Sequence, residues 1–377
     1  MNVLLVSSFV LPHAGGVEQF VDTAKKTMRG RGWNVRVLAC RLSDTSTDAD
    51  ATLPTRFLPP AGWPLPVGGL RILWREVGRA DVVVLNGARH LLPIAAAFTA
   101  RMRRKGIVFV LHGSGAPFTS GSFLYHRVLG SLFERTFVRP ALRVSHPVSV
   151  SRAGVVGARE RYGVEATYVA FPLRDLPSME RRQLPEGRPM TIVWVGRLYP
   201  EKDPLQAVAA VEQLRFRRHA TLEVYGEGIL RDRLEGLARS RPWLSIHRSR
   251  TWDEIQDLQG GADLCLATSL REGAQLAVLE ALSRGVPVVC TQVGDAPGYY
   301  LAPSLRRFCV PPGDLEATTS AMLELSRSYD RYRDAFAANA GLLRASRREG
   351  QERLAQVIEA AATTVRINSR AGVQLSA

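Results

Sequence analysis

Two successive series of short apolar segments, each alternating with helical patterns, restrict the possible folds of this chain most strongly. The first series has apolar segments at 3–7, 35–39, 81–85, 107–112 and 148–150, with helical patterns at 15–30, 92–104, 123–138 and from Ser151, a good N-cap residue. The second has apolar segments at 191–195, 221–225, 244–247, 263–267 and 286–290, with helices between them and after Asp314. Strands that alternate with helices form a mostly parallel sheet covered on both faces. We therefore predict an α/β protein with two Rossmann-like, doubly wound domains.

A proline-rich segment with few apolar residues, 171–189, separates the two series and is typical of a linker. We predict four parts: an N-terminal domain over 1–172, a linker over 173–189, a C-terminal domain over 190–345, and a helix over 346–377 that packs back toward the N-terminal domain and frays at its end. Residues 43–68 are expected to be mostly irregular, with one short strand at 56–58. Two such domains place the carboxyl ends of their sheets at a cleft, where a ligand is expected.

The net charge of +15 is concentrated in the first half of the chain. Residues 1–172 contain 22 Lys and Arg against 10 Asp and Glu (+12), whereas residues 173–377 contain 28 against 25 (+3). This asymmetry favours an anionic partner of the first half, the alternative being that the arginines only maintain solubility. Two basic elements could meet a membrane surface, residues 101–105 and the amphipathic segment 123–139, although helix-dipole and core roles explain them as well.

The apolar runs are too short to span a membrane, which takes about 18–20 residues. The opening segment 3–11 lacks the flanks of a signal peptide, so we expect a cytoplasmic protein, with the hypothesis of peripheral contact at the inner face of the cell membrane. The cysteines lie far apart, and we predict free thiols for Cys40, Cys265, Cys290 and Cys309. Asp48-Ala49-Asp50 resembles an acidic metal motif but lies in a polar loop, and the histidines lack metal-binding spacing. No metal or other cofactor is therefore expected.

The loop after the apolar segment 191–195 carries two cations and a glycine. It reads Gly196-Arg197-Leu198-Tyr199-Pro200-Glu201-Lys202-Asp203. Arginine offers a planar fork for two phosphate oxygens, lysine adds a compact charge, and the amides of a following helix can point at the same group. Arg197 and Lys202 are thus candidate ligands of a diphosphate, with Gly196 in the tight turn. The alternative is a surface loop with incidental charges.

Two glutamates, Glu272 and Glu280, are separated by seven residues, and Glu280 lies in an apolar helical pattern at 276–282. A carboxylate among apolar neighbours is costly unless it is paired or meets a ligand. Ionised carboxylates only accept hydrogen bonds, which suits the vicinal hydroxyls of a sugar. We therefore propose that Glu272 faces a sugar and Glu280 a ribose, the alternative being two surface glutamates.

Together these segments resemble the retaining family-4 glycosyltransferases, which have the GT-B fold. The likeness covers nearly the whole chain and rests on residues 196–203, on the Glu272–Glu280 segment followed by Gly285-Val286-Pro287-Val288-Val289, on the Gly15-Gly16-Val17-Glu18 loop and on His112-Gly113.

The resemblance implies a role for each matching residue. Arg197 and Lys202 would hold the donor diphosphate and stabilise the leaving group, and Glu280 would bind the ribose. Glu272 would hold the donor sugar together with backbone amides of the residues that follow it, namely Gly273, Ala274, Gln275 and Leu276. Gly16 would let its loop approach the phosphate closely, and His112 would reach the transferred sugar, although a histidine at a strand end is often structural. Gly226 and Gly228 would lie near the base.

Two departures from the family pattern concern the donor sugar. Ala274, Gln275 and Ala277 replace an aromatic residue and a proline that are common there, and Gly294-Asp295 replaces a glycine pair. The reaction class is less affected, because the charged positions are present.

We therefore predict a retaining glycosyltransferase that moves a sugar from a nucleoside diphosphate sugar to an acceptor hydroxyl, in the synthesis of a cell-surface polysaccharide or glycolipid. Its expected partners are the sugar nucleotide and a sugar or lipid-linked acceptor, and not nucleic acid. The alternatives are a nucleotide-sugar epimerase on the same fold and an inactive nucleotide-sugar-binding protein.

Overall fold

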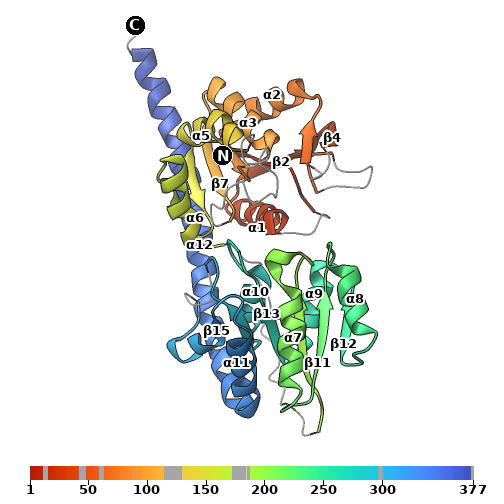
Figure 1. Ribbon diagram of the computed structural model, residues 1–377. Coiled ribbons are helices and arrows are strands. Elements are labelled where there is room, and N and C mark those ends of the chain that lie inside the picture. Colours follow the sequence, from red (N-terminus) through yellow and green to blue (C-terminus); the bar gives the residue numbers. More distant parts are fainter. Residues whose placement is uncertain are drawn as a thin grey trace. The chain divides into compact units, whose positions relative to one another are not determined.

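The computed structural model describes residues 1–11, 16–41, 48–58, 63–88, 90–113, 130–171, 184, 187–295 and 300–374, with side chains up to residue 364. The chain divides into two compact units, which are described separately (Figure 1). The N-terminal unit comprises Met1–Leu173 and Arg347–Ala377, and the C-terminal unit comprises Arg174–Ser346.

The N-terminal unit is built on a seven-stranded parallel sheet with the order β3-β2-β1-β6-β7-β8-β9. Its strands are β1 (Asn2–Ser7), β2 (Asn34–Cys40), β3 (Ala51–Leu53), β6 (Val82–Asn86), β7 (Gly106–Leu111), β8 (His146–Ser149) and β9 (Thr167–Tyr168). The central strands are almost entirely apolar because both faces of the sheet are covered. A separate antiparallel pair joins β4 (Thr55–Leu58) to β5 (Trp63–Pro66).

The helical elements of this unit are α1 (Gly16–Gly30), α2 (Leu70–Arg79), α3 (Leu91–Met102), the π-helical turn η2 (Glu134–Val138), α5 (Arg139–Arg143), α6 (Arg152–Gly157) and the π-helical turn η3 (Ala158–Tyr162). Residues of α2, α3, η2, α5 and η3 join one apolar cluster with the sheet. The expected cap is confirmed, since Ser151 Oγ accepts from the amide of Gly154 at the start of α6.

Three expectations for this unit need correction. Within 43–68, residues 43–47 and 59–62 lie outside the described part, and the described ones are not mostly irregular, because they form β3 and β5 beside the expected strand at 56–58. Strand β3 has only three residues and prolines interrupt β5, which hides an apolar alternation. The helix α2 was not expected. Of the helix expected at 123–138, residues 123–129 lie outside the described part, and the rest is helical but continues to Arg143.

The C-terminal unit has a six-stranded parallel sheet with the order β12-β11-β10-β13-β14-β15. Its strands are β10 (Met190–Val195), β11 (Ala220–Tyr225), β12 (Leu244–His247), β13 (Leu264–Ala267), β14 (Val288–Thr291) and β15 (Cys309–Val310). Its helices are the 3₁₀ turns η4 (Pro200–Lys202) and η6 (Pro303–Phe308) and the α-helices α7 (Pro204–Leu214), α8 (Arg231–Ala238), α9 (Trp252–Gly261), α10 (Leu276–Arg284) and α11 (Leu315–Arg327). Asp203 and Asp314 cap α7 and α11 by accepting from main-chain amides.

The last helix, α12 (Tyr329–Gln374), contributes to both units. It begins well before residue 346, where the C-terminal helix was expected, and its later part packs on the N-terminal sheet. The fit is tight: a Cβ added at Gly350 would lie 2.2 Å from the carbonyl oxygen of Ala170, and one at Gly106 would lie 2.7 Å from that of Ala361. Glycine is therefore needed at both places.

The four cysteines are free thiols as predicted, with Cys40, Cys265 and Cys290 buried. Burial raises the pKa of the Cys265 thiol to about 12, so it is an inert core residue. In the part of the chain that the structure describes, no helix has the length and apolar character needed to cross a membrane.

Candidate functional site

The loops that follow β10 and β13 meet at one edge of the C-terminal sheet. The Lys202 ammonium, at the end of η4, forms an ion pair with the carboxylate of Glu272, and both side chains are largely buried. The hydroxyl of Ser269 donates to the same carboxylate at 3.2 Å. The structure thus brings together the residue expected to hold phosphate and the residue expected to hold the sugar.

The two loops are also joined through buried hydrogen bonds. The amide of Leu270 donates to the carbonyl oxygen of Glu201 at 2.8 Å. Thr268 Oγ1 donates to the carbonyl oxygen of Asp203 at 2.6 Å and accepts from the indole of Trp194 at 3.1 Å. Because Thr268 and Trp194 are buried, these bonds fix the distance between the loops and hence the position of the Lys202–Glu272 pair.

Arg197 lies on the same loop but has a different environment. Its guanidinium is exposed, 3.5 Å from the Glu201 carboxylate and 5.5 Å from the centre of the Tyr199 ring. An exposed ion pair of this kind contributes little to stability. The side chain is therefore accessible to an anionic ligand.

The chain after β14 packs against the loop that carries Glu272 and is hydrogen-bonded to it. The amide of Asp295 donates to the carbonyl oxygen of Gly273 at 2.8 Å. Gly294 has φ +64°, and a Cβ there would lie 2.4 Å from the carbonyl oxygen of Glu272. Glycine is therefore required at residue 294 both by conformation and by space. This requirement explains why the first glycine of the expected glycine pair is present as Gly294, although Asp295 replaces the second.

The residues between Glu272 and α10 serve partly as supports. The side-chain amide of Gln275 donates to the carbonyl oxygen of Thr291 at 2.6 Å and is buried. The amide of Leu276 donates to the carbonyl oxygen of Ala274 at 3.0 Å. Gln275 therefore anchors the start of α10 to β14, a role that the sequence did not indicate.

Glu280 is buried on α10 and faces α9. One carboxylate oxygen accepts from the indole of Trp252 at 2.9 Å, and the other accepts from the amide of Gln256 at 2.9 Å. Gln259, one helical turn further, donates to the carbonyl oxygen of Ala277 at 3.0 Å. The carboxylate therefore ties α9 to α10, and an ionised carboxylate can accept more hydrogen bonds than these two.

Sequence reasoning missed Trp252 and Gln256, the partners of Glu280. Together with Gln259 they lie on one helical face, at the i, i+4 and i+7 positions, and this spacing is the sequence signal that could have indicated them. Helical spacing identifies such a face but not the carboxylate that it meets.

The three glycines expected near the nucleotide lie where the turns after β10 and β11 pack together. A Cβ added at Gly226 would lie 1.9 Å from the carbonyl oxygen of Gly196, and one at Gly228 would lie 2.4 Å from that of Leu198. The amide of Leu198 donates to the carbonyl oxygen of Glu227 at 2.8 Å. Glycine is needed here for close backbone packing, whether or not a nucleotide binds.

In the N-terminal unit, Asn86 links His112 to the first turn of α1. The Asn86 side-chain nitrogen donates to the carbonyl oxygen of Val17 at 3.0 Å and to Ser7 Oγ at 3.2 Å. The side-chain oxygen of Asn86 therefore points at His112. Because an amide oxygen only accepts hydrogen bonds, Nε2 of His112 carries the proton and donates it to this bond. The neutral ring consequently presents Nδ1 as an acceptor. Asn86 was missed by sequence reasoning, although it ends a strand at the same sheet edge.

The same arrangement brings Gly16 and His112 to one edge of the N-terminal sheet. Gly16 begins α1, directly before Val17, while Gly15 lies outside the described residues. Desolvation and the nearby His90 lower the pKa of His112 to about 4, so the imidazole is neutral at physiological pH. It can therefore accept or donate a hydrogen bond but carries no charge.

No group of three or more His, Cys, Asp or Glu side chains suited to a metal ion occurs among the described residues. The two aspartates of the motif at 48–50 have other partners. Asp48 pairs with Lys25 at 2.6 Å, and Asp50 accepts from the amide of Val37 at 2.8 Å. Their contacts are those of a structural loop.

Two domain families match consecutive parts of the chain. Residues 14–171 match Glycosyltransferase Family 4, and residues 189–328 match Glycosyl transferases group 1. Among curated proteins, the chain is 25% identical over 316 residues to a subunit of the phosphatidylinositol N-acetylglucosaminyltransferase of Arabidopsis thaliana, covering 79% of this chain and 68% of that protein. It is 35% identical over 117 residues to glycogen synthase of Mycobacterium tuberculosis, a match that covers 29% of this chain and 28% of that protein.

Solved structures show the same two-domain fold. S. aureus TarM, crystallised with fondaparinux, alpha-GlcNAc-glycerol and UDP, superposes with a TM-score of 0.72 at 8% identity, covering 96% of this chain and 99% of that one. The pneumococcal O-GlcNAc transferase GtfA, in complex with UDP and GlcNAc, gives a TM-score of 0.72 at 11% identity with the same coverage. Anabaena HepE, in complex with UDP and glucose, gives 0.65 at 16% identity and covers 100% of this chain and 99% of that one.

Proposed function

Because this chain is a glycosyltransferase of the GT-B fold, with a Glycosyltransferase Family 4 domain followed by a Glycosyl transferases group 1 domain, we propose that it moves a sugar from a nucleoside diphosphate sugar to an acceptor hydroxyl with retention of configuration. The observation that carries the proposal is the Lys202–Glu272 pair at the carboxyl edge of the C-terminal sheet. A cation suited to phosphate and a carboxylate suited to sugar hydroxyls lie side by side there, and a sugar diphosphate contains both of these groups.

In the proposed reaction, the bond between the anomeric carbon and the diphosphate oxygen breaks, and a bond to the acceptor oxygen forms. Negative charge grows on the departing diphosphate, and Arg197 and Lys202 stabilise that charge more strongly in the transition state than in the ground state. The acceptor proton goes to an oxygen of the leaving phosphate on the same face of the sugar. Retention by this route rests on the family resemblance.

The remaining residues have binding roles in the proposal. Glu272 accepts hydrogen bonds from the hydroxyls of the donor sugar, backbone amides of residues 273–276 donate to its oxygens, and Glu280 accepts from the ribose hydroxyls. His112 contacts the transferred sugar, and Gly16 lets its loop approach the phosphate closely. The positive side chains take the part that a metal ion has in other transferases, so the activity is proposed to be metal-independent.

The acceptor is proposed to be a sugar or a lipid-linked sugar of a cell-surface polysaccharide or glycolipid. The Arabidopsis relative carries phosphatidylinositol in its name, and the TarM and GtfA structures contain UDP. UDP-sugars are therefore the first donors to test.

A thermal-shift screen against UDP-, GDP- and ADP-sugars tests the proposal, because a ligand that binds the folded state raises the melting temperature. The best donor is then incubated with lipid-linked and free sugar acceptors, and the anomeric configuration of the product is read by NMR. A shift with one donor class and an α-linked product from an α-linked donor are expected. A product of inverted configuration would refute retention, and epimerised sugar nucleotide without transfer would refute the transferase.

A further inference from the structure

The outer surface of α2 and of the turn after α3 is cationic because the acids of this region point inward. Residues 70–79, 91–105 and 130–145 contain two acids, Glu76 and Glu134, and both are buried. The same segments contain ten cations, Arg71, Arg75, Arg79, Arg101, Arg103, Arg104, Lys105, Arg135, Arg139 and Arg143. Most of the positive charge that these segments expose to water is therefore not balanced by an acid of the same segments.

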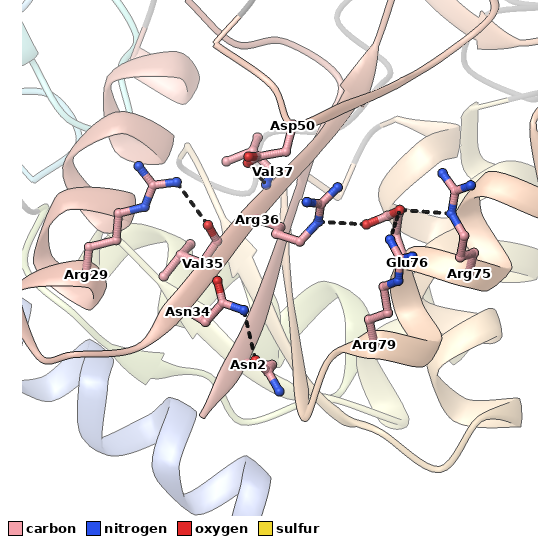
Figure 2. Close-up of polar contacts among 10 residues, drawn as sticks. All are labelled: Asn2, Arg29, Asn34, Val35, Arg36, Val37, Asp50, Arg75, Glu76 and Arg79. Atoms are coloured by element: carbon pink, nitrogen blue, oxygen red, sulfur yellow. Dashed lines mark hydrogen bonds and ion pairs between the residues drawn. The ribbon is translucent and has the colours of Figure 1, made fainter.

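Figure 2 shows how the first of these acids is held. The Glu76 carboxylate, 1% exposed, lies between three guanidinium groups, from Arg36 of β2 at 2.8 Å, Arg75 at 3.1 Å and Arg79 at 3.2 Å. One negative charge thus meets three positive charges, and the arginines of α2 remain more than half exposed. The cluster fixes their stems and leaves an excess of positive charge at the surface.

Large apolar side chains lie exposed among these arginines. Leu70 is 76% exposed, Trp74 45% and Met102 71%. The guanidinium of Arg103 lies 4.6 Å from the centre of the Trp74 ring, and the Lys105 ammonium donates to the carbonyl oxygen of Gly78 at 2.9 Å. These contacts join α2 to the turn after α3 as one surface, which we call the α2–α3 face: Leu70, Arg71, Trp74, Arg101, Met102 and Arg104.

The neighbouring element has the same character. The η2–α5 segment packs beside α3 and exposes Phe137 together with Arg135 and Arg143. Glu134 is directed inward, where it pairs with Arg161 and accepts from Tyr162. Two adjacent elements therefore repeat one pattern, in which acids are buried while cations and apolar side chains are exposed.

We propose that the α2–α3 face docks on an anionic lipid bilayer. Phosphate headgroups pair with the arginines, while Leu70, Trp74 and Met102 enter the boundary between headgroups and acyl chains, a position that tryptophan favours. Long arginine side chains reach the headgroups while their stems lie along apolar surface. Exposed leucine and methionine side chains find no apolar environment on a nucleic-acid backbone. The exposed apolar residues therefore favour a bilayer over nucleic acid as the partner.

Flotation with the full-length protein tests this proposal, using vesicles of phosphatidylcholine alone or mixed with phosphatidylglycerol. The wild type is expected to bind the anionic vesicles, and high salt should weaken the binding. The triple variant R71Q/R101Q/R104Q should bind at least about tenfold more weakly, because each cation near an anionic surface adds measurably to affinity. L70Q/M102Q should weaken binding at low salt as well as high salt, which a purely electrostatic contact would not show.

Matched controls lie on the C-terminal unit. R217Q/R233Q/R239Q removes three exposed arginines there, and F216Q removes the apolar side chain that is 83% exposed. Both controls should bind vesicles like the wild type. Equal loss in the controls, equal binding to neutral vesicles, or displacement of the vesicles by duplex DNA would overturn the proposal.

Lipid binding is measured without a sugar nucleotide and does not depend on the proposed transfer reaction. The α2–α3 variants should keep the melting temperature of the wild type and its increase with the donor, which excludes misfolding as the cause of weaker binding. Weakened vesicle binding with a lowered melting temperature in both α2–α3 variants would count against docking.

Discussion

Lys202 and Glu272 form an ion pair between the loops that follow β10 and β13. The ammonium is therefore neutralised by a carboxylate before a donor binds, and a diphosphate has to share or displace that partner. Such a pair positions the lysine, and it couples the phosphate and sugar parts of the site.

Replacing the cations should slow transfer. We expect K202A and R197A each to lower kcat by roughly tenfold or more, since a charged hydrogen bond contributes about 1.5–3 kcal/mol. K202R should retain more activity than K202A. The control is R239A, which removes an exposed arginine of the same unit. Steady-state kinetics with the best donor measure the effect, and wild-type turnover in both K202A and R197A would refute the proposed role of these two cations at the diphosphate.

Replacing Glu272 should affect the sugar and the diphosphate in opposite ways. E272Q leaves the Lys202 ammonium without its carboxylate, so the free nucleoside diphosphate should bind at least as tightly as to the wild type. The sugar nucleotide should lose affinity by at least about fivefold relative to the diphosphate, because a charged acceptor for its hydroxyls is gone. Calorimetry with both ligands measures the ratio. E201Q is the control, and an unchanged ratio in E272Q would exclude Glu272 from sugar binding.

Glu280 should contribute to nucleotide affinity as well as to packing. E280A should weaken binding of the nucleoside diphosphate by about tenfold and also lower stability, because the Gln256 amide loses its partner. W252F removes one donor to Glu280, whereas W243F makes the same change away from it. W252F should weaken nucleotide binding while W243F should not. Reduced stability with unchanged calorimetric affinity in E280A would leave Glu280 with a structural role alone.

The lowered pKa of His112 predicts a pH dependence of stability. The unfolded chain binds a proton at His112 near pH 6.5, whereas the folded chain binds it near pH 4. Between these values the unfolded state holds more protons, so stability falls as pH decreases, by up to about 3 kcal/mol. H112Q should lose this part of the pH dependence, and H146Q should keep it. Urea unfolding from pH 7 to pH 4 measures it, and identical slopes in the wild type and H112Q would contradict the prediction.

A chelator should leave the reaction unaffected. Protein dialysed against EDTA is expected to keep full transferase activity, because Arg197 and Lys202 supply the positive charge at the diphosphate. The comparison is the same protein after addition of Mg²⁺ or Mn²⁺. Loss of activity on dialysis that either ion restores would overturn the metal-free mechanism.

The sequence predicted the sheets well because their strands are buried and apolar. The strand at 244–247 has the predicted bounds, and those at 191–195 and 221–225 begin one residue earlier than expected. Short edge elements were missed, since prolines interrupt β5 and only three residues form β3. Helix α2 was missed because two of its apolar residues, Leu70 and Trp74, face outward and obscure its buried apolar face.

The individual site residues could be proposed from residue type and order, but their partners could not. Nothing in the spacing of Lys202 and Glu272 indicates that they pair, since seventy residues separate them and loop geometry decides the contact. The same holds for Asn86 with His112 and for Trp252 with Glu280. Charge and motif therefore predict which groups a ligand would need, whereas the supporting hydrogen bonds depend on tertiary packing.

The path of α12 has a consequence for biosynthesis. Residues from Arg347 onward cover the N-terminal sheet at Gly106 and Ala170, so that unit is completed only after the whole C-terminal unit has been synthesised. The C-terminal unit is continuous in sequence and can fold as soon as it has emerged. The order of synthesis and the order of completion of the two units are therefore reversed, and a nascent chain released near residue 173 would lack the helix that closes its first unit.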